Sequence, residues 1–148
     1  MEGIQMVEIT SKNSIENEQQ LPLKEQIIKR LRELPQEIYN QDAEIMKTQE
    51  DINDMDFKGK LIRNQQILDV SDQKDMEGKQ LYKNEMSREA AVNKNLEMNE
   101  QYQDIMEKIK KNMRSLKEHQ IYLEFIKNKF SASKYIARLI GDEEDKEC

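Results

Sequence analysis

Cysteine, tryptophan, glycine and proline are all scarce in this chain of 148 residues. It has one cysteine, Cys148, no tryptophan, four glycines and two prolines. A single cysteine excludes an internal disulfide framework and a cysteine-based zinc cluster. A reducing compartment is its simplest setting, so we expect a cytoplasmic protein. The shortage of turn-forming residues disfavours an architecture of many short strands.

Apolar residues are also few. Hydrophobic residues make up 36% of the chain and charged residues another 36%, whereas globular proteins have about 45–50% and about 25%. A thick core is therefore excluded, and long helices that bury a narrow stripe fit the composition better. No run approaches the roughly 18 apolar residues that a membrane-spanning helix needs, and the N-terminus lacks the pattern of a secretory signal. We expect no membrane association.

Apolar residues recur at intervals of seven in two long segments. The first segment has the rows Leu31, Ile38, Ile45, Ile52 and Ile27, Leu34, Gln41, Thr48, Met55. The second has the rows Tyr102, Ile109, Leu116, Leu123, Phe130, Ala137 and Met98, Ile105, Asn112, His119, Ile126, Ser133, Ile140. Repeats sustained over this many heptads are typical of a coiled coil.

The periodicity also divides the chain into segments. We predict a flexible N-terminal arm at 1–21, a helical region at 22–69, a connection at 70–83, a long helix at 84–140 and an acidic disordered tail at 142–148. Asn84 or Ser87 is suited to cap the start of the long helix, and Gly141 is suited to end it. Pro35 and Gly59 lie inside the first helical region, and the sequence leaves open whether the helix continues through them.

The predicted fold is all-α: residues 22–141 form a long antiparallel helical hairpin, a coiled coil. Folding back at the connection places Ile52 near residue 100 and Leu31 near residue 121. Further apolar residues widen both helix faces beyond the needs of two helices. We therefore expect the chain to self-associate into a helical bundle, as a dimer.

The only histidine, His119, lies in the same heptad row as Asn112, seven residues further along the chain. A catalytic histidine needs a nucleophile or carboxylate within hydrogen-bond distance in a concave site, which a smooth helical pair does not provide. We interpret Asn112 and His119 as polar seam positions that fix helix register. Burial in the seam would also make assembly sensitive to pH.

Residues 54–65 come close to a calcium-binding loop without completing one. Asp54, Asp56 and Gly59 match the first, third and sixth positions, but the fifth is Lys58, which has no oxygen ligand, and the twelfth is Gln65, where a bidentate glutamate is required. No phosphate-binding glycine loop or nucleophile motif is present. We expect no catalytic residues, no metal, no cofactor and no small-molecule substrate, and hence no enzyme.

Two groups of residues are candidate contact surfaces. The residues Ile121, Tyr122 and Phe125 are apolar but lie outside the heptad rows, which makes them a candidate protein interface. A basic cluster is a candidate nucleic-acid contact, and its members are Lys108, Lys110, Lys111, Arg114 and Lys117. Clustered positive charge is the footprint of phosphate binding, although the net charge of the chain is −6.

The segments EGKQLYKNEMSREAAVNKNLEMNEQYQDI and IYLEFIKNKFSASKYIARLIG resemble small coiled-coil proteins of phages and prophages that are encoded near recombination and single-strand DNA genes. The similarity covers residues 21–141. The family has no established activity and no catalytic residues to carry over. The resemblance implies a setting in phage biology, within the host cell cytoplasm.

These features favour a non-enzymatic coiled-coil protein that binds an unidentified protein, as a phage accessory protein or as an inhibitor of a host defence or nuclease system. The alternative is a nucleic-acid-binding accessory in phage DNA recombination, acting through the basic cluster.

Overall fold

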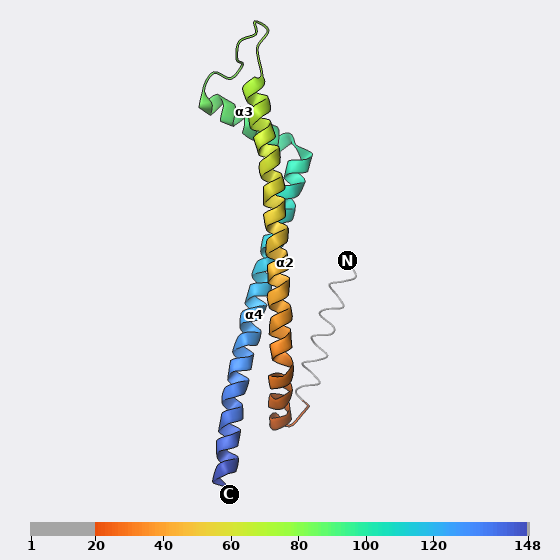
Figure 1. Ribbon diagram of the computed structural model, residues 1–148, viewed down its shortest axis with the longest axis vertical. Helices are drawn as coiled ribbons and strands as arrows, with labels where there is room; N and C mark the ends of the chain where they lie inside the picture. The colour runs from red at the N-terminus through yellow and green to blue at the C-terminus, as the bar shows by residue number, and fades with distance from the viewer. Residues whose placement is uncertain (1–19, 148) are drawn as a thin grey trace. The chain divides into compact units, whose positions relative to one another are not determined.

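The computed structural model describes residues 20–147 and contains three α-helices in that range: α2 (Leu23–Asp72), α3 (Glu85–Met98) and α4 (Glu100–Lys146) (Figure 1). Helix accounts for 87% of the described residues, and none of them lies in a strand. The all-α prediction is confirmed. The predicted N-terminal arm lies almost wholly outside the described residues. Between residues 20 and 147, no helix has a stretch long and apolar enough to cross a bilayer.

The chain divides into two compact units. The central unit is Ala43–Gln120, and the terminal unit combines the residues up to Asp42 with those from Ile121 onward. Helices α2 and α4 each contribute residues to both units.

In the central unit, α2 packs against α3 and the first part of α4. Its hydrophobic core is formed by Val70, Val92 and Leu96, which are all nearly fully buried. Partly buried hydrophobic residues surround this core: Ile62, Tyr82, Ala91 and Tyr102. Val70 belongs to α2, so the prediction that the connection begins at residue 70 was wrong. The burial of Val70 explains why the helix continues to Asp72.

The helices of the central unit run antiparallel, because higher positions on α2 contact lower positions on α4. Met55 accepts a hydrogen bond from Asn112, and Gly59 lies against Met106. This register differs by about two heptads from the expected one, which placed Ile52 near residue 100. A shift by whole heptads keeps the same apolar rows face to face, so the repeat alone does not determine the register.

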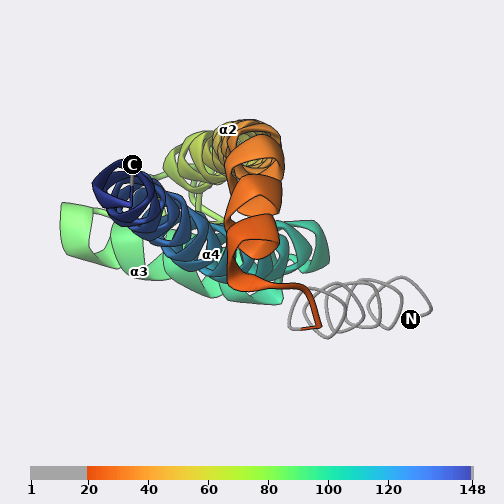
Figure 2. The same ribbon diagram turned by 90° about the horizontal axis from the view of Figure 1, so that it is seen from below.

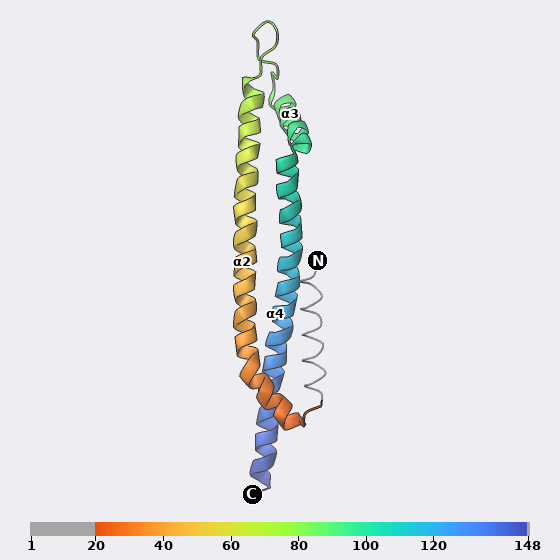
Figure 3. The same cartoon turned by 90° about the vertical axis from the view of Figure 1, so that its right-hand side faces the viewer.

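The predicted long helix 84–140 is divided at Asn99. Asn99 has extended backbone angles, and its side chain accepts a hydrogen bond of 2.9 Å from the Tyr102 amide, which caps the start of α4. An uninterrupted helix would carry the row of Tyr102 back to Asn95 and Arg88, which are polar. The break lets Val92 and Leu96 enter the core instead. Figures 2 and 3 show the change of direction between α3 and α4.

Met98 was expected in a heptad row and is exposed, because it is the last residue of α3. Asn84 accepts a bond of 2.7 Å from the Ser87 amide, which confirms Asn84 as the cap of α3.

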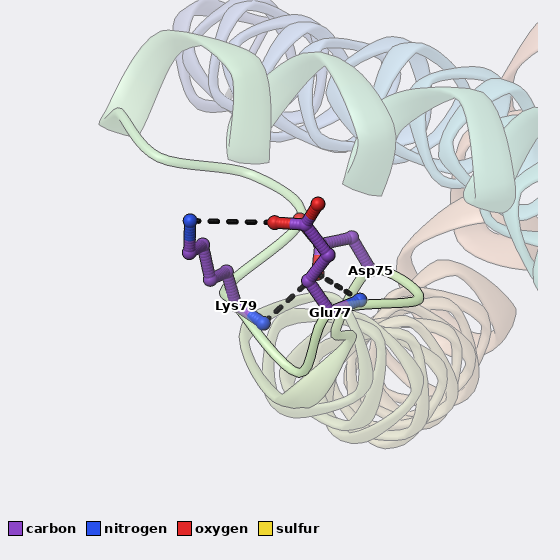
Figure 4. Close-up of polar contacts among 3 residues, drawn as sticks. All are labelled: Asp75, Glu77 and Lys79. Atoms are coloured by element: carbon purple, nitrogen blue, oxygen red, sulfur yellow. Dashed lines mark hydrogen bonds and ion pairs between the residues drawn. The ribbon is translucent and has the colours of Figure 1, made fainter.

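A tight turn lies in the connection between α2 and α3 (Figure 4). The Asp75 carboxylate accepts hydrogen bonds of 2.9 Å from the amides of Glu77 and Lys79, whose side chains form an ion pair with an N–O distance of 3.3 Å. Gly78 has a φ of 77°, a left-handed conformation that favours glycine because it has no Cβ. The connection is thus locally ordered by its own polar groups.

In the terminal unit, the first part of α2 and the last part of α4 also run antiparallel. Lys24 pairs with Glu144 at 2.6 Å, near the start of α2 and the end of α4. The buried residues are Ile27, Leu34, Ile126 and Ser133, and all four belong to the predicted rows. Pro35 lies inside α2 without ending it, and Gly59 does not end it either.

The predictions for the C-terminal end of α4 were wrong. The helix continues through Gly141 to Lys146, where a disordered acidic tail was expected. Gly141 does not have a positive φ, so it does not form the left-handed stop. The ion pair between Lys24 and Glu144 holds this last turn against α2, and Lys146 supplies a positive charge at the helix end.

Candidate interaction surfaces

The two polar seam positions, Asn112 and His119, are half-buried in the central unit. The Asn112 amide nitrogen donates a hydrogen bond of 3.8 Å to the Met55 sulfur, so a polar group in one predicted row contacts a residue in the other. Both positions lie on helix α4. Their placement in the helix pair fits the structural role suggested by the repeat.

The apolar group Ile121, Tyr122 and Phe125 is exposed in the terminal unit. The rings of Tyr122 and Phe125 stack with centroids 6.3 Å apart. The Tyr122 hydroxyl donates a hydrogen bond to the Glu37 carboxylate on α2. Burial, this hydrogen bond and the charge of Glu37 together raise the pKa of Tyr122 to about 12. Ile121 and Phe125 therefore offer exposed apolar surface, whereas Tyr122 also joins α4 to α2 through its hydroxyl group.

Ile121 and Phe125 of this group belong to a longer, mostly apolar row along α4 of the terminal unit, which we call the outer row. It consists of Ile121, Phe125, Asn128, Ala132, Tyr135 and Leu139, all of them exposed. Ile121 is five residues from the buried Ile126, which places it about 140° away around the helix. The outer row therefore lies on the far side of α4 from the face that packs against α2.

Helix α2 has a comparable exposed row within the central unit. Its members are Met46, Phe57, Leu61 and Leu68. Phe57 is five residues from the buried Ile52, again about 140° around the helix. Each unit thus has one apolar face buried between its helices and a second one exposed.

The five basic residues of the candidate nucleic-acid contact are exposed on α4 in the central unit. Lys110, Arg114 and Lys117 follow one another at intervals of four and three residues and so share one face of the helix. Lys108 lies on another side, where it pairs with Asp104 at 3.0 Å. The structure therefore aligns three of the five predicted cations and separates Lys108 from them.

Among residues 20–147, an open groove lies beside the helices in each unit. The groove in the central unit is lined by Arg63, Ile67, Ser71, Glu85, Arg88, Glu89 and Val92. The groove in the terminal unit is lined by Lys24, Ile27, Ile28, Leu31, Ala137, Ile140, Gly141 and Glu144. In residues 20–147, no three His, Cys, Asp or Glu side chains are grouped so that they could hold a metal ion.

No family model, curated protein or solved structure matches this chain.

Sequence reasoning identified only part of these surfaces. It selected Ile121, Tyr122 and Phe125 but missed Tyr135 and Leu139, which extend the same row. The signal was present, because the spacing from Ile121 to Leu139 alternates between four and three residues. The stronger repeat on the opposite face of the helix concealed it.

Proposed function

We propose that this protein is a non-enzymatic coiled-coil hairpin that self-associates and acts by binding another protein. The observation that carries the proposal is the second apolar face on each unit, represented by Phe57 and Leu61 in the central unit and by Phe125 and Tyr135 in the terminal unit. Large exposed apolar rows on a soluble helix mark surfaces that another chain covers.

The antiparallel helices of each unit support the hairpin part of this proposal. Heptad rows supply the buried residues Ile27, Leu34 and Ile52 on α2, and Ile105 and Ile126 on α4. Burial along a/d rows supports coiled-coil packing.

The biological setting of the proposal comes from the sequence resemblance alone. That resemblance supports a role as a phage accessory protein, and a component of a host defence or nuclease system is the partner that such a role favours. Affinity purification of the tagged protein from the infected host, followed by mass spectrometry, tests this part. We expect the native chain to recover one host protein reproducibly. The double variant Phe57→Ser, Leu61→Ser should fail to recover that protein.

Sedimentation equilibrium over about a hundredfold range of concentration tests self-association. The expected result is a mass that rises with concentration toward an integral multiple of the monomer. A constant monomer mass throughout the range would remove the self-association part of the proposal.

A second candidate function is nucleic-acid binding through Lys110, Arg114 and Lys117, which share one exposed face of α4. A gel-shift titration with single-stranded DNA at several salt concentrations tests it. Binding that weakens steeply as salt increases supports this function, because released counterions drive phosphate contacts. The triple variant with these residues changed to Ser should then lose binding, whereas Lys108→Ser should change it little. Absence of a shift at low salt eliminates the candidate.

A further inference from the structure

The outer row of the terminal unit has the spacing of a coiled-coil seam. From Ile121 to Leu139 its six positions alternate between intervals of four and three residues. That alternation is the a/d pattern of a helix that packs along another helix. The face of α4 that packs against α2 is the other one, which includes Ile126 and Ser133. The outer row is therefore a second seam, available on the exposed side.

The outer row is complementary to itself when a second copy runs in the opposite direction. With the two copies related by a twofold axis at residue 130, the facing pairs are Ile121 with Leu139, Phe125 with Tyr135, and Asn128 with Ala132. Every layer then joins an a position to a d position. The large side chains meet at both ends and the two smaller ones meet near the centre. Such a contact uses the same surface on both copies, as a twofold dimer requires.

The charges beside the row match the same arrangement. Glu124 precedes Phe125, and Arg138 precedes Leu139. In the antiparallel pair, Glu124 of one copy lies next to Arg138 of the other, and the symmetry creates this pair twice. Both side chains are exposed, and among residues 20–147 neither has an ion-pair partner within the chain. Opposite charges flanking a seam select partner and direction.

On the other flank of the row, one contact favours the antiparallel pairing and one opposes it. There Tyr122 of one copy meets Ile136 of the other, which joins two apolar side chains. Lys129 meets its counterpart near the twofold axis, and this repulsion weakens the association. A lysine at such a position can direct its ammonium group to solvent while its stem covers apolar surface.

The exposed area corresponds to a small interface. Ile121, Phe125, Tyr135 and Leu139 have 61%, 59%, 63% and 46% of their surfaces exposed. Covering these four residues on both copies, together with their flanks, buries on the order of 1,000 Å². That area reaches the lower limit of about 1,000 Å² for a biological interface.

We propose that a second copy of this chain docks antiparallel on the outer row of α4 and forms a twofold dimer with Glu124–Arg138 ion pairs at its flanks. This inference rests on the proposed self-association and specifies its surface and direction.

Disulfide trapping in the full chain, with Cys148 changed to Ser, tests the direction. Asn128→Cys and Ala132→Cys are prepared as separate proteins, and both positions are exposed. The expected result is a cross-linked dimer when the two proteins are mixed and oxidised, and none when either is oxidised alone. Cross-linking of each variant with itself would indicate a parallel pair and would overturn the proposal.

Charge exchange tests the surface by sedimentation equilibrium. Arg138→Glu and Glu124→Arg should each weaken the dimer about tenfold in Kd, because two attractive pairs become repulsive. The double variant should restore the native Kd. Lys127→Glu is the matched control, since it changes net charge as Arg138→Glu does but lies outside the row, and it should leave Kd unchanged.

The outcomes separate this inference from the proposed function. A dimer that neither cross-links in the mixture nor responds to charge exchange overturns the outer-row contact and leaves self-association standing. A chain that stays monomeric at every concentration overturns both.

Discussion

Tyr122 combines an exposed aromatic ring with a hydroxyl group that is bound to Glu37. Its ring stacks on Phe125 and adds to the apolar surface of the terminal unit, while its hydroxyl joins α4 to α2. Because the hydrogen bond requires a protonated phenol, the contact between the helices depends on the ionisation of this residue. The sequence could predict that Tyr122 lies off the heptad row. It could not predict Glu37 as the partner, because that contact depends on the register of the two helices.

The sign of the pH effect follows from the raised pKa. Tyr122 has a pKa of about 12 in the folded chain and 10.0 as the ordinary value. Its stabilising contribution is therefore complete below pH 10 and is lost as pH rises toward 12. Tyr122→Phe should lower stability at neutral pH by about 0.5–1 kcal/mol, and its unfolding free energy should change less than that of the native chain between pH 10 and 12.

Urea denaturation at a series of pH values measures this difference, with Tyr39→Phe as the control for an exposed tyrosine. Equal pH dependence of the native chain and Tyr122→Phe above pH 10 would contradict the role of Glu37.

At the scale of the helix, Gly59 marks a close approach of α2 and α4 in the central unit. A Cβ atom on Gly59 would lie 2.9 Å from the Met106 terminal methyl, 3.7 Å from Ile105 and 3.9 Å from Tyr102. Gly141, also inside a helix, has no atom within 4 Å of such a Cβ. The first glycine therefore serves packing, and the second does not.

These two glycines should respond differently to substitution. Gly141→Ala should stabilise the chain by about 1 kcal/mol through helix propensity alone. Gly59→Ala should gain less, because the flexible end of Met106 must move, and Gly59→Leu should cost about 1–3 kcal/mol through overpacking. Chemical denaturation of the three variants measures the changes. If leucine were tolerated at residue 59 without loss, the close approach of the helices would be refuted.

The cap at Asn99 provides a second test at this scale. Asn99→Ala removes the side chain that accepts the Tyr102 amide hydrogen, so it should destabilise the central unit by about 1 kcal/mol. Asn99→Ser should retain most of the stability, since serine also caps helices. The free energy of unfolding from denaturant titration distinguishes the two, and identical values for alanine and serine would argue against a capping role.

The heptad repeat predicted correctly which residues of the helices face inward, because the spacing of apolar residues along one helix is a local property. It identified Ile27, Leu34 and Ile52 on α2, and Ile105 and Ile126 on α4, as inward-facing residues, and all five are buried. It did not predict the division at Asn99, since a single asparagine is an ordinary helix residue. The gain that favours the break, the burial of Val92 and Leu96 against Val70, involves a distant part of the chain.

At the scale of the whole molecule, the question is whether one chain can cover its own apolar surface. Each unit buries one apolar face between its helices, while large residues such as Phe57 and Tyr135 are exposed. The composition, with hydrophobic and charged residues both at 36%, predicted a thin core. The repeat did not specify which face a second chain would cover, because the buried and exposed rows on α4 both follow heptad spacing.

Thermal stability should therefore depend on protein concentration. If two copies fold and associate together, each tenfold increase in concentration adds about 1.4 kcal/mol per dimer. For a dimer of this chain length, that corresponds to an increase in Tm of about 2 °C per tenfold, so about 4 °C over a hundredfold range. Circular dichroism melts of the native chain measure this shift, and Arg138→Glu should reduce it while Lys127→Glu should not. A Tm that stays constant over the whole range would mean that the exposed rows contribute nothing to the stability of the fold.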